Sequence, residues 1–220
     1  MYSAIVVKLY YKLKIICAFI QEWTGEDTLA PVALSDGGDK SGMVTAVRLA
    51  VVDNQAAILS AYESGQLLLS FISDNKIEGV AQFQFAIHDF VPLSLEFDSE
   101  KLIGVVAGSQ DKVITFKISE KCFSILTERT MPSKGISSLC LRRHDRKILI
   151  ATSWDSTVKL FSWIKPEKLK PLAALKFHTD SVEAVTCTKY PVEGIKLKGH
   201  LIAAGSKDQK ISLWSVYNDI

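Results

Sequence analysis

The stretch AAGSKDQKISLW (residues 203–214) decides the fold of this chain. The two alanines are predicted to end one strand, and the polar residues 205–209 to form a turn. Ile211 and Leu213 then resume a second strand, in which apolar residues occupy alternate positions. The stretch therefore predicts a β-hairpin.

This hairpin pattern recurs along the chain. Similar stretches are AGSQDKVITFK (107–117), ATSWDSTVKLF (151–161) and the weaker SAYESGQLLLS (60–70). An ungapped alignment places Asp111, Asp155 and Asp208 at one position, with Ser64 in the weakest copy, and these positions are 47, 44 and 53 residues apart. A period near 40–45 residues with several strands per repeat is typical of β-propeller blades. We therefore predict an all-β propeller with about four blades visible.

The chain is long enough to bury a substantial core, with 220 residues of which 48% are hydrophobic. Its net charge is only +2, which predicts no strong field for nucleic acid or an anionic membrane. The cysteines form no CxxC pair, so we expect reduced thiols in an intracellular protein. They are Cys17, Cys122, Cys140 and Cys187.

Residues 1–42 are expected to differ from the rest of the chain. They are predicted to hold the strands of a partial blade, at 5–10 and 15–20, followed by a polar linker over 21–42. Lysines interrupt the apolar N-terminal run, so it is too short for a spanning helix of about 20 residues and does not fit a signal peptide. We expect no membrane association. Residues 43–220 are expected to form four repeats, at about 43–73, 88–118, 134–163 and 178–217.

The last copy resembles a WD repeat. It combines an opening His, a turn Asp and a Trp six residues later, namely His178, Asp208 and Trp214. In that family these side chains tie a loop to the turn by hydrogen bonds, which is a structural role. The resemblance assigns such roles to His88, Asp111, Asp155, His178, Asp208 and Trp214. Alanines stand four residues before the Asp, where the family often has Ser or Thr, so we expect most blades to lack the full network.

A closer resemblance covers residues 134–217 and, less strongly, 40–71. It is to a small group that comprises the ASTRA-associated WD-repeat protein of fungi and the G-protein-beta-subunit-like protein of animals. The resemblance implies a non-catalytic scaffold of the nucleus and cytoplasm, linked to chromatin remodelling. Its implied partners are AAA+ ATPases and co-chaperones that mature phosphatidylinositol-kinase-related kinases. The alternative is a G-protein-beta-like signalling adaptor, which should carry a coiled-coil heptad run for its partner; the chain shows none.

Propellers of this group have about seven blades. Four repeats and two leading strands are visible here, and we see no outer strand for the last blade. We therefore expect an N-terminally truncated part of a seven-bladed ring. A self-closed ring of four blades is the alternative.

No motif predicts catalysis. SDGGDKSG (35–42) has Asp39 where a phosphate-binding loop needs its last glycine, and no helix pattern follows. His178, Asp180 and Ser181 lack the strained turn of a nucleophile. The four histidines are too dispersed for a metal site. We predict no catalytic residue, cofactor, metal or small-molecule substrate.

Trp154 is the candidate anchor for a protein partner. It precedes the turn Asp155, on the rim of one propeller face, where the other copies have the polar residues Glu63, Gln110 and Lys207. An exposed aromatic residue at a rigid rim is typical of an interface hot spot. The alternative is that Trp154 packs under a neighbouring loop.

The run LRRHDRK (141–147) is a second surface candidate. A basic turn of this kind could contact an acidic partner or a phosphate. More often such a run is a solvated hairpin. Both interpretations stay open at this point.

Overall fold

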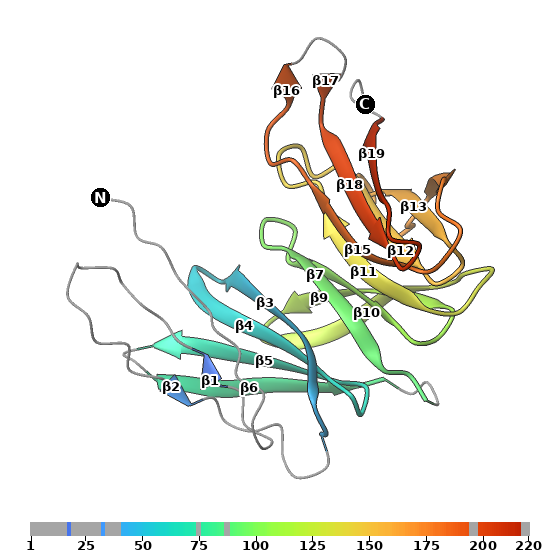
Figure 1. The fold of residues 1–220 in the computed structure, drawn as a ribbon. Coiled ribbons are helices and arrows are strands. Elements are labelled where there is room, and N and C mark those ends of the chain that lie inside the picture. Colours follow the sequence, from blue (N-terminus) through green and yellow to red (C-terminus); the bar gives the residue numbers. More distant parts are fainter. Residues whose placement is uncertain are drawn as a thin grey trace, which may run out of the picture.

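The computed structural model describes residues 17–18, 32–33, 41–73, 76–85, 89–193 and 198–216. Every element in these ranges is a β-strand (Figure 1), which confirms the predicted all-β class. Within the same ranges, no helix is long and apolar enough to cross a membrane.

The strands form four antiparallel sheets that follow one another along the chain, as a propeller requires. Blade 1 contains β3 (Val44–Val52), β4 (Gln55–Tyr62), β5 (Gln66–Ser73) and β6 (Lys76–Gln84). Blade 2 contains β7 (Pro92–Asp98), β8 (Ile103–Gly108), β9 (Lys112–Ser119) and β10 (Cys122–Thr130). Blade 3 contains β11 (Ile136–Leu141), β12 (Ile148–Ser153), β13 (Thr157–Ser162) and β14 (Pro171–Lys176).

The described part of blade 4 has three strands. They are β15 (Val182–Cys187), β18 (Leu201–Ser206) and β19 (Ile211–Ser215). Two further pairs of short strands are β1 (Cys17–Ala18) with β2 (Val32–Ala33), and β16 (Val192–Glu193) with β17 (Lys198–Gly199). The predicted repeat ranges hold the first three strands of each blade, and β6, β10 and β14 follow as outer strands.

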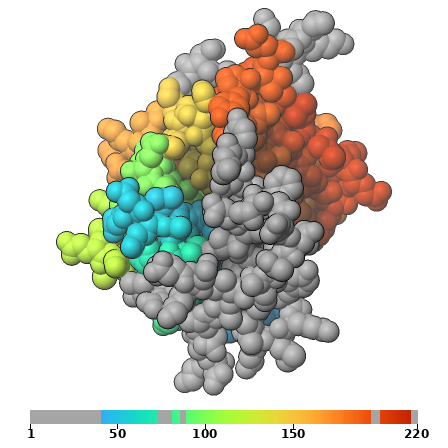
Figure 2. All heavy atoms as spheres, turned by 90° about the vertical axis from the view of Figure 1, so that its left-hand side faces the viewer, coloured from blue at the N-terminus to red at the C-terminus, as the bar shows by residue number. Residues whose placement is uncertain are grey.

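The first strand of every blade lies on the inside of the propeller. Strand β3 contacts β7, β7 contacts β11, and β11 contacts β15, so the blades follow an arc (Figure 1). In Figure 2, which shows one face of the molecule, residues of blade 1 are blue and lie at the left, and residues of blade 4 are red and lie at the right. The predicted segment 1–42 lies outside the described residues, except for β1, β2 and its last two residues.

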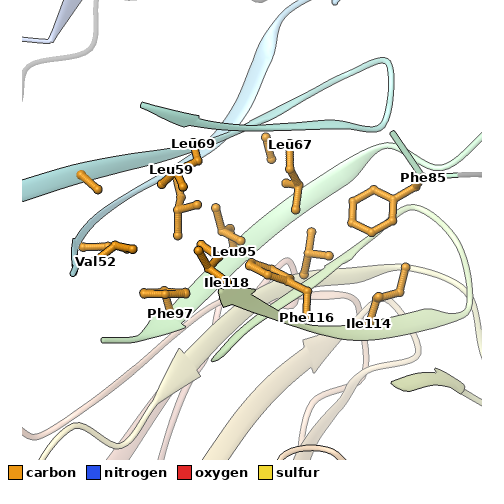
Figure 3. Packing of buried hydrophobic residues seen from close by; sticks show 14 of the residues in the cluster. Val52, Leu59, Leu67, Leu69, Phe85, Leu95, Phe97, Ile114, Phe116 and Ile118 are labelled. Carbon is orange, nitrogen blue, oxygen red and sulfur yellow. The ribbon is translucent and has the colours of Figure 1, made fainter. Parts of the chain in front are cut away.

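The core lies between neighbouring blades, so the middle strands have both faces covered. All of β12 is buried, whereas the outer strand β10 is mostly exposed or half-buried. Figure 3 shows this packing between blades 1 and 2, where Leu59 and Leu69 meet Leu95 and Phe97. Each blade needs its neighbour to bury these faces, which is why the propeller stabilises the repeats together.

A bulge recurs at one place in all four blades. The pairing of the first two strands shifts at the second residue of the inner strand, at Thr45, Leu93, Ser137 and Glu183. A bulge adds one residue and increases the local twist of the strand. The four inner strands therefore bend in the same way where they enter the blade.

Candidate protein-interaction face

The turns between the second and third strands provide the candidate rim. In blades 1, 3 and 4 the residue after the second strand is Glu63, Trp154 or Lys207, as the sequence alignment predicts. Each of these residues donates its backbone N–H to the carbonyl just before the inner strand of its own blade. The three positions are therefore structurally equivalent.

Blade 2 corrects the alignment by one residue. Gly108 pairs with the start of the inner strand as Ser153 does in blade 3, so Ser109 is the equivalent of Trp154. Gln110 therefore stands at the turn-Asp position, and Asp111 lies one residue beyond it. No hydrogen bond joins the side chain of Asp111 to the residues that the structure describes, and its predicted partner His88 lies outside them, so the structural role of Asp111 stays a prediction.

Blade 4 carries a continuous side-chain network behind its turn. The Nδ1 atom of His178 lies 3.0 Å from Asp208 Oδ2, and its Nε2 atom lies 2.8 Å from the hydroxyl of Ser212. The indole N–H of Trp214 donates to the same hydroxyl at 2.9 Å. The network is complete because Ser212 supplies the hydroxyl from β19, four residues after the Asp. The alanine four residues before it, Ala204, therefore does not signal a missing network in this blade.

The carboxylate of Asp208 also holds the backbone of its turn. It accepts hydrogen bonds from the amides of Thr179 and Lys210, at 3.0 Å each. Burial alone would raise the pKa of this carboxyl group, but these amides, with His178 and Ser206, lower it to about 2. Asp208 is therefore ionised at neutral pH and braces the turn.

Blade 3 uses a different set of groups for the same purpose. Asp155 accepts hydrogen bonds from Ser133, from Thr157 and from the ammonium group of Lys159, which lies 2.5 Å from Oδ2. Burial opposes ionisation, but Lys159 leads the hydrogen-bonding groups that hold the pKa of Asp155 well below its usual range. Lys159 occupies the position of Ser212 in blade 4, so one cation replaces the His–Ser pair. His88, the predicted histidine of blade 2, lies outside the described residues.

Trp154 is both packed and exposed. Its ring lies against Gly135, where an added Cβ would sit 2.0 Å from a ring carbon, and its backbone N–H donates to the Gly135 carbonyl at 3.0 Å. The residue is nevertheless 44% exposed. One side of Trp154 therefore packs against the backbone at Gly135 and the rest faces solvent, and its role as an anchor for a partner stays a prediction.

The neighbouring rim residues are polar. Glu63 is exposed, and Lys207 pairs with Glu183 at 3.2 Å. Gln110 is half-buried, and its side-chain amide donates to the carbonyl of Asp89 at 3.3 Å. Trp154 is thus the large apolar side chain among the four predicted rim positions.

The basic run at 141–147 is the turn of the β11–β12 hairpin, with Arg143 and His144 exposed, and its three arginines bind carboxylates of the protein itself. Arg142 is 1% exposed, and its guanidinium binds both oxygens of Asp145, at 3.0 and 2.6 Å. Arg143 binds Glu96 at 2.7 Å, and Arg146 pairs with Glu100. These arginines are occupied within the protein, because acidic residues from blades 2 and 3 reach them.

Trp163 is a structural residue that sequence reasoning missed. It is fully buried, and its indole N–H donates to Asp98 Oδ2 at 3.2 Å. Asp98 ends β7 in blade 2 and Trp163 follows β13 in blade 3, so the contact joins two blades. A Trp directly after a predicted strand was the available signal, but nothing in the sequence points to its partner.

A groove lies between blades 2 and 3, lined by residues of β10, β13 and β14 and by the segment that follows β10. It has a volume of about 690 Å³, and its lining includes Met131, Phe161, Leu172 and Arg129. In the part of the chain that the structure describes, no group of three or more His, Cys, Asp or Glu residues could hold a metal ion. The features of this face are therefore the rim of turn residues, with the exposed Trp154, and the apolar groove between blades 2 and 3.

Comparisons with known proteins agree with the fold. The family model for the WD domain, G-beta repeat, matches residues 121–162 and 169–215. Guanine nucleotide-binding protein subunit beta-like protein 1 of Mus musculus is 35% identical over 162 residues, which cover 73% of this chain and 44% of that protein.

Two fungal proteins are similar over more of the chain. ASTRA-associated protein 1 of Schizosaccharomyces japonicus is 29% identical over 190 residues, and that of Schizosaccharomyces pombe is 27% identical over 193 residues. Each alignment covers 81% of this chain and 49% of the relative. The chain thus spans about half the length of the curated relatives it matches.

Proposed function

This chain is a WD-repeat protein with ASTRA-associated and G-protein-beta-like homologues, and from that premise we propose that it is a non-catalytic scaffold subunit of an ASTRA-type complex. It would hold AAA+ ATPases and kinase co-chaperones together while phosphatidylinositol-kinase-related kinases mature. It would act in the nucleus and the cytoplasm, with a link to chromatin remodelling. The names of the fungal relatives support the assignment to this assembly.

The observation that carries the proposal is the exposed ring of Trp154 on a braced turn. The Asp155 network and the contact with Gly135 hold the turn, so little side-chain entropy is lost when a partner covers the ring. Tryptophan is enriched among residues whose truncation costs most at protein interfaces. This makes Trp154 the predicted anchor for a partner protein.

The polar clusters of the described residues favour a structural role over catalysis. His178, Asp208 and Ser212 bond to one another, and the Asp155 carboxylate is bound by Lys159. A catalytic carboxylate or histidine must instead reach a substrate. The proposed scaffold therefore works by binding.

Affinity purification of the full chain tests the proposal. Mass spectrometry would compare the wild type, Trp154→Ala and Ile164→Ala. Ile164 is a matched control because it is 52% exposed and apolar but lies beyond the other end of β13. We expect AAA+ ATPases and kinase co-chaperones to co-purify with the wild type and with Ile164→Ala. Their recovery with Trp154→Ala should be about tenfold lower, which corresponds to a loss of about 1.4 kcal/mol in binding free energy.

The melting temperature of each variant decides how a loss is interpreted. An unchanged melting temperature with reduced recovery would support Trp154 as the anchor. Equal losses of stability and recovery would place Trp154 in the core instead. Absence of these partners from the wild-type sample would contradict the scaffold assignment itself.

A second candidate is a G-protein-beta-like signalling adaptor. The mouse relative favours it, because its name describes a G-protein beta-like subunit and its identity is 35%. The same purification separates the two functions. Recovery of a G-protein gamma subunit in place of the ATPases would favour the adaptor.

A further inference from the structure

Two cysteines from different blades lie side by side inside the propeller. Cys140 is on β11 and Cys187 is on β15, the innermost strands of blades 3 and 4. Their sulfur atoms are 3.4 Å apart, although the residues are 47 positions apart in the sequence. Both are free thiols and half-buried, so a small molecule has partial access to the pair.

The two thiols are chemically different because they share one hydrogen bond. The thiol of Cys140 donates to the sulfur of Cys187. This bond raises the pKa of Cys140 and lowers the pKa of Cys187, although burial and the charge of Glu96 oppose the second shift; the charge of Arg142 adds to it. Thiolates are the reactive form of cysteine. Cys187 is therefore the nucleophile of the pair.

We propose that Cys140 and Cys187 form a covalent modification site, at which a hydroperoxide closes a disulfide between blades 3 and 4. The sulfur atoms of a disulfide are about 2.05 Å apart, so the two sulfurs must approach by about 1.4 Å. The strands β11 and β15 that carry the two cysteines are already in contact.

The reaction balances without a cofactor. The Cys187 thiolate attacks one oxygen of hydrogen peroxide, the O–O bond breaks, and Cys187 becomes a sulfenic acid as hydroxide leaves. Cys140 then loses its proton and its sulfur attacks the Cys187 sulfur, the S–O bond breaks, and water leaves. In total, two thiols are oxidised and one peroxide is reduced to two waters.

The third described cysteine provides an internal comparison. Cys122 starts β10 on the outside of blade 2 and is exposed. It is accessible to the same oxidant, but no other cysteine is in contact with it among the described residues. Peroxide should oxidise Cys122 without closing a link, and should close the link between Cys140 and Cys187.

Peptide mapping of the full chain tests this site. The reduced protein is treated with hydrogen peroxide, blocked with N-ethylmaleimide and cleaved with trypsin without reductant. We expect one new species that joins peptide 135–142, which holds Cys140, to peptide 177–189, which holds Cys187. It should disappear after reduction, persist in Cys122→Ser, and be absent from Cys140→Ser.

The disulfide should also stabilise the fold. Because it closes a long loop between two blades, the oxidised protein should melt about 5–10 °C above the reduced one. A wild-type sample oxidised in denaturing urea is the control that needs no variant, since its cysteines should pair without preference.

Two results would overturn the proposal. One is recovery of peptides 135–142 and 177–189 with both cysteines blocked by maleimide, at a peroxide dose that oxidises Cys122. The other is a native pairing pattern no more selective than the pattern in urea.

Discussion

Replacing Trp163 with Phe should remove a fully buried hydrogen bond between blades 2 and 3. Trp163 is 0% exposed and Asp98 is 1% exposed, and the bond between the indole N–H and Asp98 Oδ2 is 3.2 Å long. The other Asp98 oxygen accepts from the amide of Glu100 at 3.1 Å. The variant would leave Oδ2 without the indole donor in a buried setting.

The expected loss has two parts. A hydrogen bond to a buried charge contributes about 1.5–2 kcal/mol. Phe also buries on the order of 50 Å² less apolar surface than Trp, which at about 25 cal/mol per Å² is about 1.3 kcal/mol. Trp163→Phe should therefore lower the free energy of unfolding by about 3 kcal/mol and the melting temperature by about 6–12 °C.

Urea unfolding followed by circular dichroism measures this loss without relying on tryptophan fluorescence. The matched control is Trp214→Phe. Trp214 is half-buried and donates to the neutral hydroxyl of Ser212, so its replacement should cost only about 1 kcal/mol. If Trp163→Phe costs no more than Trp214→Phe, at an unchanged dependence on urea, the argument that Asp98 and Trp163 tie the blades is refuted.

Three further predictions concern the rim. Gly135→Ala should cost about 1–2 kcal/mol, because φ is +81° at Gly135 and an added Cβ would displace the Trp154 ring. A red shift of tryptophan emission checks the displacement, and an unchanged spectrum would contradict it. Asp208→Asn should lower the urea midpoint at pH 7. The pKa of Asp208 falls from 3.8 to about 2 on folding, so the stability that the ionised carboxylate adds is fully present above pH 4 and is lost towards pH 2. The urea midpoints of the variant and the wild type should therefore converge over this range. A difference between them that does not change with pH would contradict the role of the ionised Asp208. Lys159→Met should lower the free energy of unfolding by about 1–2 kcal/mol, because it leaves Asp155 without its cation. The loss caused by Lys159→Met should be smaller when Asp155 is also changed to Asn. Strictly additive losses in this double-mutant cycle would show that the pair does not interact.

The blade pattern was predictable because its signals are local. The turn residues around Asp155 and Asp208, and the apolar positions that follow them, repeat within short stretches of sequence. The structure confirms the hairpin at 203–214, with β18 pairing to β19 across the predicted turn. It also confirms the propeller class that the spacing predicts.

The register of blade 2 was not predictable from the same pattern. Residues 113–116 of β9 are all buried, because neighbouring blades cover both faces of the strand. The apolar residues Ile114 and Phe116 alternate with Thr115, yet all three are buried, so this alternation does not reveal which residues take the register of the other blades. This is why Asp111 was aligned with Asp155 although Gln110 holds that place.

Contacts between blades were also hidden from the sequence. Trp163 and Asp98 are 65 residues apart, and Arg143 and Glu96 are 47 residues apart. The sequence of the basic run 141–147 therefore does not show that its arginines form ion pairs within the protein. Ser212 was missed for a simpler reason, because the hydroxyl of the network was sought before the turn and lies after it.

The buried carboxylate of Glu96 joins three successive blades. Its oxygens bind Arg48 of blade 1 at 2.9 Å and Arg143 of blade 3 at 2.7 Å, while Glu96 itself is on the inner strand of blade 2. If blade 1 or blade 3 opened alone, the buried Glu96 would lose one of its two cationic partners, and if blade 2 opened alone, both arginines would lose Glu96. The three blades should therefore unfold as one cooperative unit, so that amide hydrogens of β3, β7 and β11 exchange with solvent at a common free energy.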